Sequence, residues 1–495
     1  MAIAVGIPES VKGFLDGKPK GLFIDNDYVD AASGETMASI NPATGEAFAE
    51  VHVANEKDID RAVASARKAL EGEWASMSPD DRGRLMWRLA DLVEDNLEEL
   101  ATLETLDNGK PIVVARRDDI PNVAAMFRYY GGWATKNHGK TIPVSAGNFH
   151  VYTRHEPVGV CAGIIPWNYP IMMAGWKLAP ALACGNVMIM KPAEQTPVSL
   201  LRFAELMRDA GFPAGVVNIV NGDGPNAGGP LARHPGVDKV AFTGSVETGR
   251  RIVEASLGNL KRVSLELGGK SPNIVFDDAD AEERKDGALW GIFYNMGQDC
   301  TAGSRLFVNS GVYDDTLGEL VEGAQGLTVG SGFDESVDIG PLVSQEQMEK
   351  VLGYIDVGGG SDGARVATGG QRVGDSGYFV QPTVLADASN DMRVAQEEIF
   401  GPVVTVIPFK DEDELIAKAN DSIFGLGAGV WTRDIKRAHR VAAALKAGTV
   451  WVNTYGPVDP AAPFGGYKQS GHGREMGEYA LDLYSEVKCI WINLD

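Results

Sequence analysis

The chain has 495 residues, of which 44% are apolar and 23% are charged, and its formal net charge is −23. This length and composition predict a folded globular protein of two or three domains. The acidic balance argues against nucleic acid or an anionic membrane surface as a partner, because both require clustered Lys and Arg.

The N-terminal residues and the cysteines carry information about the setting of the protein. Residues 2–7 are mildly apolar, but Glu9 and Lys12 interrupt them, so no signal peptide is expected. The longest strongly apolar stretch, residues 158–167, is shorter than the ~20 residues of a membrane span. The four cysteines form no C-x-x-C pair, so we expect no metal site and no disulfide framework, and a reducing, cytoplasmic setting fits best.

The first part of the chain is predicted to be helical, and the next part to alternate strands with helices. Residues 56–107 place apolar side chains such as Ile59, Ala62 and Val63 at helical spacing. From about residue 157, short apolar runs alternate with helical stretches at 199–210 and 248–256, which is typical of a doubly wound parallel sheet. The predicted strands are 160–165, 187–190, 216–220, 239–242 and 263–267.

A second alternating region follows, at about residues 271–467, with Gly and Pro at its joints. The last segment, 485–493, alternates around Val487, Cys489 and Trp491. It is interpreted as a strand that pairs with another segment, with another subunit as a candidate partner. The strands predicted in the second region are 273–276, 306–308, 403–409, 427–431 and 449–452.

A dinucleotide site requires a strand that leads into a helix N-terminus, glycines near phosphate, and an acceptor for ribose hydroxyls. Residues 242–249 best fit the first requirement, with Gly244 and Ser245 at the turn; the partial glycine pattern at 221–224 is explained equally well as a plain turn. Glu194 follows the first strand by about 30 residues, where an acidic side chain binds ribose. A carboxylate there would repel a 2′-phosphate and favour NAD over NADP, although a solvated helix start explains Glu194 equally well.

Cys300 is the candidate nucleophile. Cys161, Cys184 and Cys489 lie in apolar contexts, and core packing is expected for each. Cys300 instead lies in a small, polar, glycine-rich segment, 295–304, of the kind that can leave a thiol accessible and stabilise the thiolate.

A thiolate that attacks a carbonyl needs hydrogen-bond donors for the oxyanion and a base for later hydrolysis. Asn168, between two prolines at a strand end, is the candidate donor, with a simple turn role as the alternative. Glu266 lies in an apolar run before a Gly-Gly turn, where partial burial would raise its pKa and suit it to proton transfer. A buried ion pair with Lys270 is the alternative for Glu266.

Together, the motifs resemble the aldehyde dehydrogenase superfamily over essentially the whole chain, and most closely its hydrolytic, NAD-dependent, broad-specificity branch. The motifs are Ile165-Pro166-Trp167-Asn168, Lys191-Pro192-Ala193-Glu194, Phe242-Thr243-Gly244-Ser245, Leu265-Glu266-Leu267-Gly268-Gly269-Lys270, Gly297-Gln298-x-Cys300, Glu398-Ile399-Phe400-Gly401-Pro402 and Pro463-Phe464-Gly465-Gly466-Tyr467-Lys468.

The resemblance implies an α/β fold with three parts. A Rossmann-like NAD-binding domain would span residues 1–137 and 157–267, and a second α/β domain, the catalytic domain, would span 268–477. A small β extension for oligomerisation would comprise 138–156 and 478–495. The implied assembly is a homo-oligomer, either a tetramer or a dimer.

The resemblance also implies a role for each motif residue. Cys300 would be the nucleophile, Asn168 and the Cys300 backbone N–H the oxyanion donors, and Glu266 the base for thioester hydrolysis. Lys177 and Glu475 would form a proton path from that base. The implied NAD-binding residues are Ile165, Pro166, Trp167, Lys191, Glu194, Gly244, Ser245, Glu398 and Phe400.

The aldehyde substrate would bind in a tunnel with apolar, aromatic and charged side chains. Aromatic residues and methionines suit an apolar or aromatic chain, whereas Arg117, Asp118 and Asp299 make an amino- or polar-substituted aldehyde a candidate unless they are solvated rim residues. The implied substrate residues are Tyr169, Met173, Trp176, Tyr294, Asp299, Thr301 and Val458.

Three alternatives remain open at this point. An acyl transfer to coenzyme A is disfavoured by Glu266, because relatives that use coenzyme A generally lack a carboxylate there. A structural or binding protein on the same fold need not keep nucleophile, base and oxyanion donor together. A cysteine hydrolase would need a histidine base, and no histidine of this sequence stands out.

Overall fold

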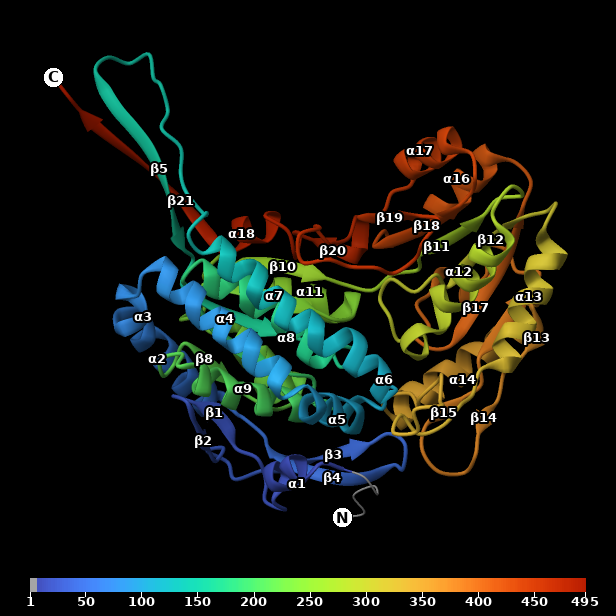
Figure 1. Ribbon diagram of the computed structural model, residues 1–495, viewed down its shortest axis with the longest axis horizontal. Coiled ribbons are helices and arrows are strands. Elements are labelled where there is room, and N and C mark those ends of the chain that lie inside the picture. The colour runs from blue at the N-terminus through green and yellow to red at the C-terminus, as the bar shows by residue number, and fades with distance from the viewer. Residues whose placement is uncertain (1–6) are drawn as a thin grey trace.

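Two sheets with parallel strands at their centres organise the chain, as a computed structural model describes it for residues 7–495 (Figure 1). Most of the apolar 2–7 segment, on which the expected absence of a signal peptide depends, lies outside the described residues. Among the described residues, no helix has both the length and the apolar character that a bilayer crossing requires.

The first sheet has eight strands in the order β2-β1-β8-β7-β6-β9-β10-β20. Its central strands are parallel and almost completely buried, so each reads as a continuous apolar run, as expected for a sheet covered on both faces. All five strands predicted in this region are confirmed. The bounds are β1 Leu22–Ile24, β2 Asp27–Val29, β6 Val160–Ile164, β7 Val187–Lys191, β8 Val217–Ile219, β9 Lys239–Thr243, β10 Arg262–Glu266 and β20 Gly471–His472.

Helices cover this sheet, and the prediction of helix for residues 56–107 is confirmed. Helices α4, α7 and α8 lie side by side across it in Figure 1. The Asn55 side chain caps α2, and Ser78 caps α4 ahead of Pro79, so both starts follow the preferred N-terminal signals. The bounds are α1 Glu9–Leu15, α2 Glu56–Glu71, α3 Glu73–Ser76, α4 Pro79–Asp95, α5 Leu97–Asn108, α6 Ile112–Val114, α7 Ile120–Trp133, α8 Pro170–Ala183, α9 Val198–Ala210, α10 Gly229–Arg233 and α11 Val246–Ala255.

The second sheet has seven strands in the order β13-β16-β17-β12-β11-β18-β19. The five predicted strands of this region are its β11, β12, β17, β18 and β19. The short β20, which lies inside the range 268–477, leaves this region and pairs antiparallel with β10 of the first sheet. The strand bounds are β11 Pro272–Val275, β12 Arg305–Asn309, β13 Arg365–Thr368, β16 Thr383–Ala386, β17 Val403–Phe409, β18 Gly427–Trp431 and β19 Thr449–Val452.

Helices of the second region, the short α18 near the C-terminus and two small hairpins complete the body. The helices are α12 Ala281–Phe293, α13 Tyr313–Gly326, α14 Gln345–Gly359, α15 Arg393–Gln396, α16 Glu412–Asn420, α17 Ile435–Ala444 and α18 Tyr479–Leu483. The hairpins pair β3 Thr36–Asn41 with β4 Glu46–His52, and β14 Arg372–Val373 with β15 Phe379–Val380.

A two-stranded arm projects from the body (Figure 1). Its strands, β5 Phe149–Pro157 and β21 Ser485–Asn493, pair antiparallel over their full length. The segment 485–493 therefore finds a pairing partner within the same chain rather than only in another subunit. The expected core packing of Cys489 is wrong: its thiol is exposed, because the arm stands clear of the body.

Candidate active site

A cavity of about 870 Å³ is lined by residues of both sheet regions. Parallel strands β6, β9 and β10 are neighbours, so their carboxyl ends meet at one edge of the first sheet. Asn168, Ser245 and Glu266 follow or end these strands and line the cavity, and Cys300 and Glu398 reach it from the second region. This edge is where parallel sheets commonly bind ligands.

The turn before Cys300 is strained and tightly packed. Asn295 and Met296 have φ values of 48° and 57°, which L-residues rarely adopt, and Gly297 follows at φ 67°. A Cβ on Gly297 would lie 2.1 Å from the Gly401 carbonyl oxygen, so only glycine fits. Backbone strain of this kind persists only where surrounding contacts enforce it, and such contacts are common at functional sites.

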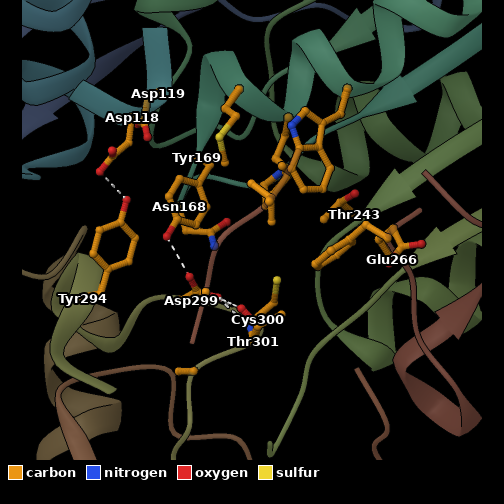
Figure 2. A pocket seen from close by; sticks show the side chains of 18 of the residues that line it. Asp118, Asp119, Asn168, Tyr169, Thr243, Glu266, Tyr294, Asp299, Cys300 and Thr301 are labelled. Carbon is orange, nitrogen blue, oxygen red and sulfur yellow. Dashed lines mark hydrogen bonds between the residues drawn. The ribbon is translucent and has the colours of Figure 1, made fainter. Parts of the chain in front are cut away.

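Cys300 is half-buried and its Sγ lies within the cavity (Figure 2). Burial raises the pKa of its thiol well above the usual range, and the carboxylates of Asp299, Glu398 and Glu266 raise it further, while its own backbone N–H lowers it. The sequence predicted that the Cys300 thiol would be accessible and that its surroundings would stabilise the thiolate. Of these two expectations, only the accessibility is found. The surrounding charges favour the neutral thiol.

The Asn168 side chain is buried beside the nucleophile turn. Its Nδ2 donates to the Gln298 carbonyl oxygen at 3.0 Å, and the Asn295 amide donates to the same oxygen at 3.0 Å. Asn168 is thus more than a turn residue, because its amide is held next to Cys300, as Figure 2 shows.

Glu266 is buried at the end of β10, and its Oε2 has no hydrogen-bond partner among the described residues. Burial first, and then the charge of Glu475, raise the pKa of its carboxyl well above the usual range, as the sequence predicted. Glu475 forms an ion pair with Lys177, whose Nζ also donates to the Thr243 hydroxyl at 2.7 Å.

The alternative ion pair between Glu266 and Lys270 does not form. The Lys270 ammonium is buried without a hydrogen-bond partner among the residues that the structure describes, and burial lowers its pKa to about 7. A lysine in this state does not neutralise Glu266.

The expected cofactor residues flank one end of the cavity. Ser245 caps α11 by accepting the Thr248 N–H at 3.2 Å, so the helix N-terminus opens at this edge. The rings of Trp167 and Phe400 meet edge to face at 5.2 Å, and Phe400 has a φ of 61°. Pro166, Gly244 and Glu398 also line the cavity.

Lys191 and Glu194 lie further along the same edge, outside the lining of this cavity. They form an ion pair of 3.3 Å at the end of β7, and the Ile165 N–H donates to the Lys191 carbonyl oxygen at 3.1 Å. Burial lowers the pKa of Lys191, and Glu194 partly opposes that effect.

The other end of the cavity contains every residue expected to bind substrate. Two tyrosine–carboxylate pairs define its wall, Tyr169 with Asp299 at 2.8 Å and Tyr294 with Asp118 at 2.9 Å (Figure 2). Arg117 is paired with Asp118 and mostly exposed, so it is a rim residue.

Two polar residues of α14 line the cavity without any signal in the sequence that predicts it. Gln347 donates to the Phe400 carbonyl oxygen at 2.7 Å, and Lys350 lies one turn further on. On an amphipathic helix these positions look like ordinary solvated residues. Among the described residues, no group of three or more His, Cys, Asp and Glu is placed to bind a metal ion.

Comparison with known proteins agrees with this geometry. The model of the aldehyde dehydrogenase family matches residues 28–490. A Bacillus subtilis (strain 168) protein described as the aldehyde dehydrogenase DhaS is 52% identical over 495 residues, which is 100% of this chain and 99% of that protein. Human mitochondrial aldehyde dehydrogenase is 51% identical over 476 residues, which cover 96% of this chain and 92% of the human protein.

A solved structure shows the same fold. The NAD+ complex of an aldehyde dehydrogenase from Bacillus cereus superposes with a TM-score of 0.98, is 52% identical, and covers 100% of both chains. The predicted α/β fold class is thereby confirmed. The chain belongs to the aldehyde dehydrogenase family, as its motifs predicted.

Proposed function

We propose that this enzyme oxidises an aldehyde to a carboxylic acid with NAD, through a thioester on Cys300. One observation carries the proposal: three complementary groups line a single cavity. They are the half-buried Cys300 thiol, the buried Asn168 amide and the buried Glu266 carboxylate, whose pKa is raised. These are the nucleophile, oxyanion donor and base that acyl chemistry requires.

The cavity edge fits a dinucleotide. A helix N-terminus with free N–H groups opens at Ser245 and suits phosphate oxygens. The Glu398 carboxylate, fixed by the Gly269 N–H at 2.8 Å, is an acceptor for ribose hydroxyls, and Trp167 and Phe400 offer apolar surface beside it. When bound, NAD accepts the hydride that leaves the substrate carbon.

The adenosine end is assigned to Lys191 and Glu194, with Ile165, Pro166 and Gly244 shaping the backbone between the two ends. A carboxylate at Glu194 repels a 2′-phosphate, which supports NAD rather than NADP. The B. cereus relative, whose structure is described as an NAD+ complex, points the same way.

Acylation requires the Cys300 thiol to lose its proton and attack the aldehyde carbon. The oxyanion that forms receives the Cys300 backbone N–H and the Asn168 amide. Asn168 uses one N–H on the Gln298 carbonyl, which fixes the plane of its amide and leaves the other N–H for substrate. Preorganised donors of this kind stabilise charge that develops in the transition state.

Deacylation requires a water made nucleophilic by a base. Glu266 accepts the water proton, and its raised pKa makes it a stronger base than an exposed carboxylate. The Lys177–Glu475 ion pair, with Thr243, lies behind it and offers a route for the proton to leave the buried site.

The substrate end supports an apolar or aromatic aldehyde, since Tyr169, Met173, Trp176 and Tyr294 line it together with Thr301 and Val458. The Asp118 carboxylate is already paired and Arg117 lies at the rim, so neither by itself demands a charged substrate.

The proposed organisation follows the boundaries expected from the sequence. We assign residues 1–137 and 157–267 to the NAD-binding domain, 268–477 to the catalytic domain, and 138–156 with 478–495 to the oligomerisation part, of which β5 and β21 form the exposed arm while α18 packs on the body. A homo-oligomer, tetramer or dimer, would cover the exposed arm, and a cytoplasmic location is consistent with the free cysteines.

The test compares Cys300→Ala with the parent enzyme. We expect aldehyde-dependent NADH formation to fall by at least about 10³-fold, with NAD binding, measured by calorimetry, nearly unchanged. Product analysis with and without coenzyme A separates hydrolysis from acyl transfer. Parental activity in Cys300→Ala, or a strict need for coenzyme A, would refute the proposal.

A further inference from the structure

The side chain next to the nucleophile, Asp299, is held by three donors. Its Oδ1 accepts the Thr301 N–H and the Thr301 hydroxyl, both at 2.6 Å, and its Oδ2 accepts the Tyr169 hydroxyl at 2.8 Å (Figure 2). A carboxylate accepts all three, whereas an asparagine can accept only the two Thr301 bonds and can join Tyr169 only if the tyrosine oxygen accepts instead of donating.

These bonds join two loops that are far apart in the sequence. Tyr169 precedes α8 and adjoins the oxyanion donor Asn168, while Thr301 and Asp299 flank Cys300. Asn168 makes a second link, from its amide to the Gln298 carbonyl oxygen at 3.0 Å. Two bonds thus tie the loop of the donor to the loop of the nucleophile.

We propose that Asp299 is a positioning residue, which clamps the nucleophile loop to the oxyanion-donor loop through Thr301 on one side and Tyr169 on the other. This inference rests on the proposed function, because holding the two loops together matters only if Cys300 and Asn168 act on the same substrate carbon. Rigid placement matters since a displacement of about 1 Å at a reacting atom can cost on the order of 100-fold in rate.

The clamp has an electrostatic cost. A carboxylate beside the thiol disfavours thiolate, and Asp299 is the charged group that raises the pKa of Cys300 most. A side chain that served only to pack or to activate the thiol would be better without this charge. The negative charge of Asp299 is explained if its hydrogen bonds contribute more to the reaction than a more acidic Cys300 thiol would.

The experiment measures thiol reactivity and turnover separately in Asp299→Asn and Tyr169→Phe. The rate of iodoacetamide alkylation is followed against pH on the peptide that contains Cys300, by mass spectrometry and without substrate or cofactor. Free glutathione, alkylated in the same mixture, is the internal standard. Steady-state kcat and KM are measured on the intact enzyme.

The two variants should differ in the pKa of the Cys300 thiol, which a general loss of structure around the site would not explain. In Asp299→Asn the Cys300 pKa should fall, because a neighbouring negative charge that raises it is removed, yet kcat should fall about 10-fold. In Tyr169→Phe the carboxylate stays, so the thiol pKa should not fall, while kcat falls about 10-fold.

Tyr313→Phe is the matched control, because it removes a tyrosine–carboxylate bond, from the Tyr313 hydroxyl to Asp387 at 3.1 Å, whose two residues do not line the cavity. Its thiol pKa, kcat and KM should all equal the parent values. Parental kcat in both Asp299→Asn and Tyr169→Phe overturns the proposal. So does a loss of kcat in Asp299→Asn with no fall in the thiol pKa.

These outcomes are distinct from a failure of the proposed function. If Cys300 is not the nucleophile, Cys300→Ala stays active whatever the clamp variants do. The alkylation profile needs no turnover, so it reports the effect of Asp299 on the thiol in either case.

Discussion

Cys300 and Glu266 share an unusual property, since burial and neighbouring carboxylates raise the pKa of both. The thiol is therefore mostly protonated near neutral pH, and the carboxyl holds its proton over a wider range than an exposed one. In the proposed mechanism both groups act in their deprotonated forms, Cys300 as nucleophile and Glu266 as base. Activity should consequently depend strongly on pH.

The first prediction concerns the pH profile. Because both pKa values are raised, kcat/KM should increase as the pH rises from about 6 to about 9, toward 10-fold per pH unit where one ionisation dominates. In Asp299→Asn this rise should begin at lower pH, because the thiol loses a neighbouring negative charge. Initial rates of NADH formation across this range test it, and a flat profile would contradict the assignment of raised pKa values.

The second prediction concerns stability. A buried carboxyl with a raised pKa favours folding while it is protonated, and this contribution is lost as the pH rises above its unfolded value of 4.5. Glu266→Gln cannot ionise, so its Tm relative to the parent should increase from pH 5 to pH 8 by about 1–2 °C. Calorimetric scans at several pH values measure this difference. If it is constant or narrows, the pKa of Glu266 is not raised.

At the scale of elements, the turn between α12 and Cys300 determines where the thiol lies. Gly297 has a φ of 67° and no room for a Cβ against the Gly401 carbonyl. The third prediction is that Gly297→Ala lowers stability by about 1–3 kcal/mol and lowers kcat further by displacing Cys300. Denaturant unfolding and steady-state kinetics measure the two effects.

Gly318→Ala is the matched control for that substitution. Gly318 lies on the exposed face of α13, where a Cβ would meet nothing within 4 Å. Alanine there should be neutral or stabilise by up to about 1 kcal/mol, since glycine is a poor helix residue. If both variants lose stability equally, the crowded turn at Gly297 is not the cause.

The elements that the sequence predicted are those with strong local patterns. Strands β6, β7 and β9 read as apolar runs because both faces of their sheet are covered, and α2 shows a clear apolar stripe. The strand β13 carried no such signal, because it lies at the edge of its sheet and its side chains are exposed or half-buried, so no apolar run marks it.

The candidate site was predictable where its residues stand in motifs, as Cys300 and Glu266 do. The link between Tyr169 and Asp299 was not, because it spans 130 residues and depends on how the two loops meet in space. The exposure of Cys489 was missed for a similar reason. An apolar local context predicts burial only if the segment packs on the body, and β21 instead lies in the arm.

At the scale of the whole molecule, the arm exposes large apolar side chains, with Val487 61% and Trp491 53% exposed. Exposed apolar surface of this kind is typical of an interface between subunits. The fourth prediction is that the enzyme is a homo-oligomer and that Val487→Asp with Trp491→Asp reduces its mass in solution, because a buried unpaired charge costs several kcal/mol. Light scattering after size-exclusion chromatography measures the mass.

Ile435→Asp provides the control, since Ile435 is 67% exposed on α17, in the body of the molecule. It should leave the mass unchanged. A parent enzyme that is monomeric, or an oligomer that persists when the arm carries both aspartates, would show that the arm is not the interface.

In the proposed mechanism an acyl group forms on Cys300, and Glu266 helps water to remove it. The most direct test is a single-turnover reaction of Glu266→Gln with excess aldehyde and NAD, followed by intact-protein and peptide mass spectrometry. We expect hydride transfer to proceed and an acyl adduct to accumulate on the peptide that carries Cys300, then to decay slowly. Continued turnover with no adduct, or an adduct on any other residue, would contradict the account.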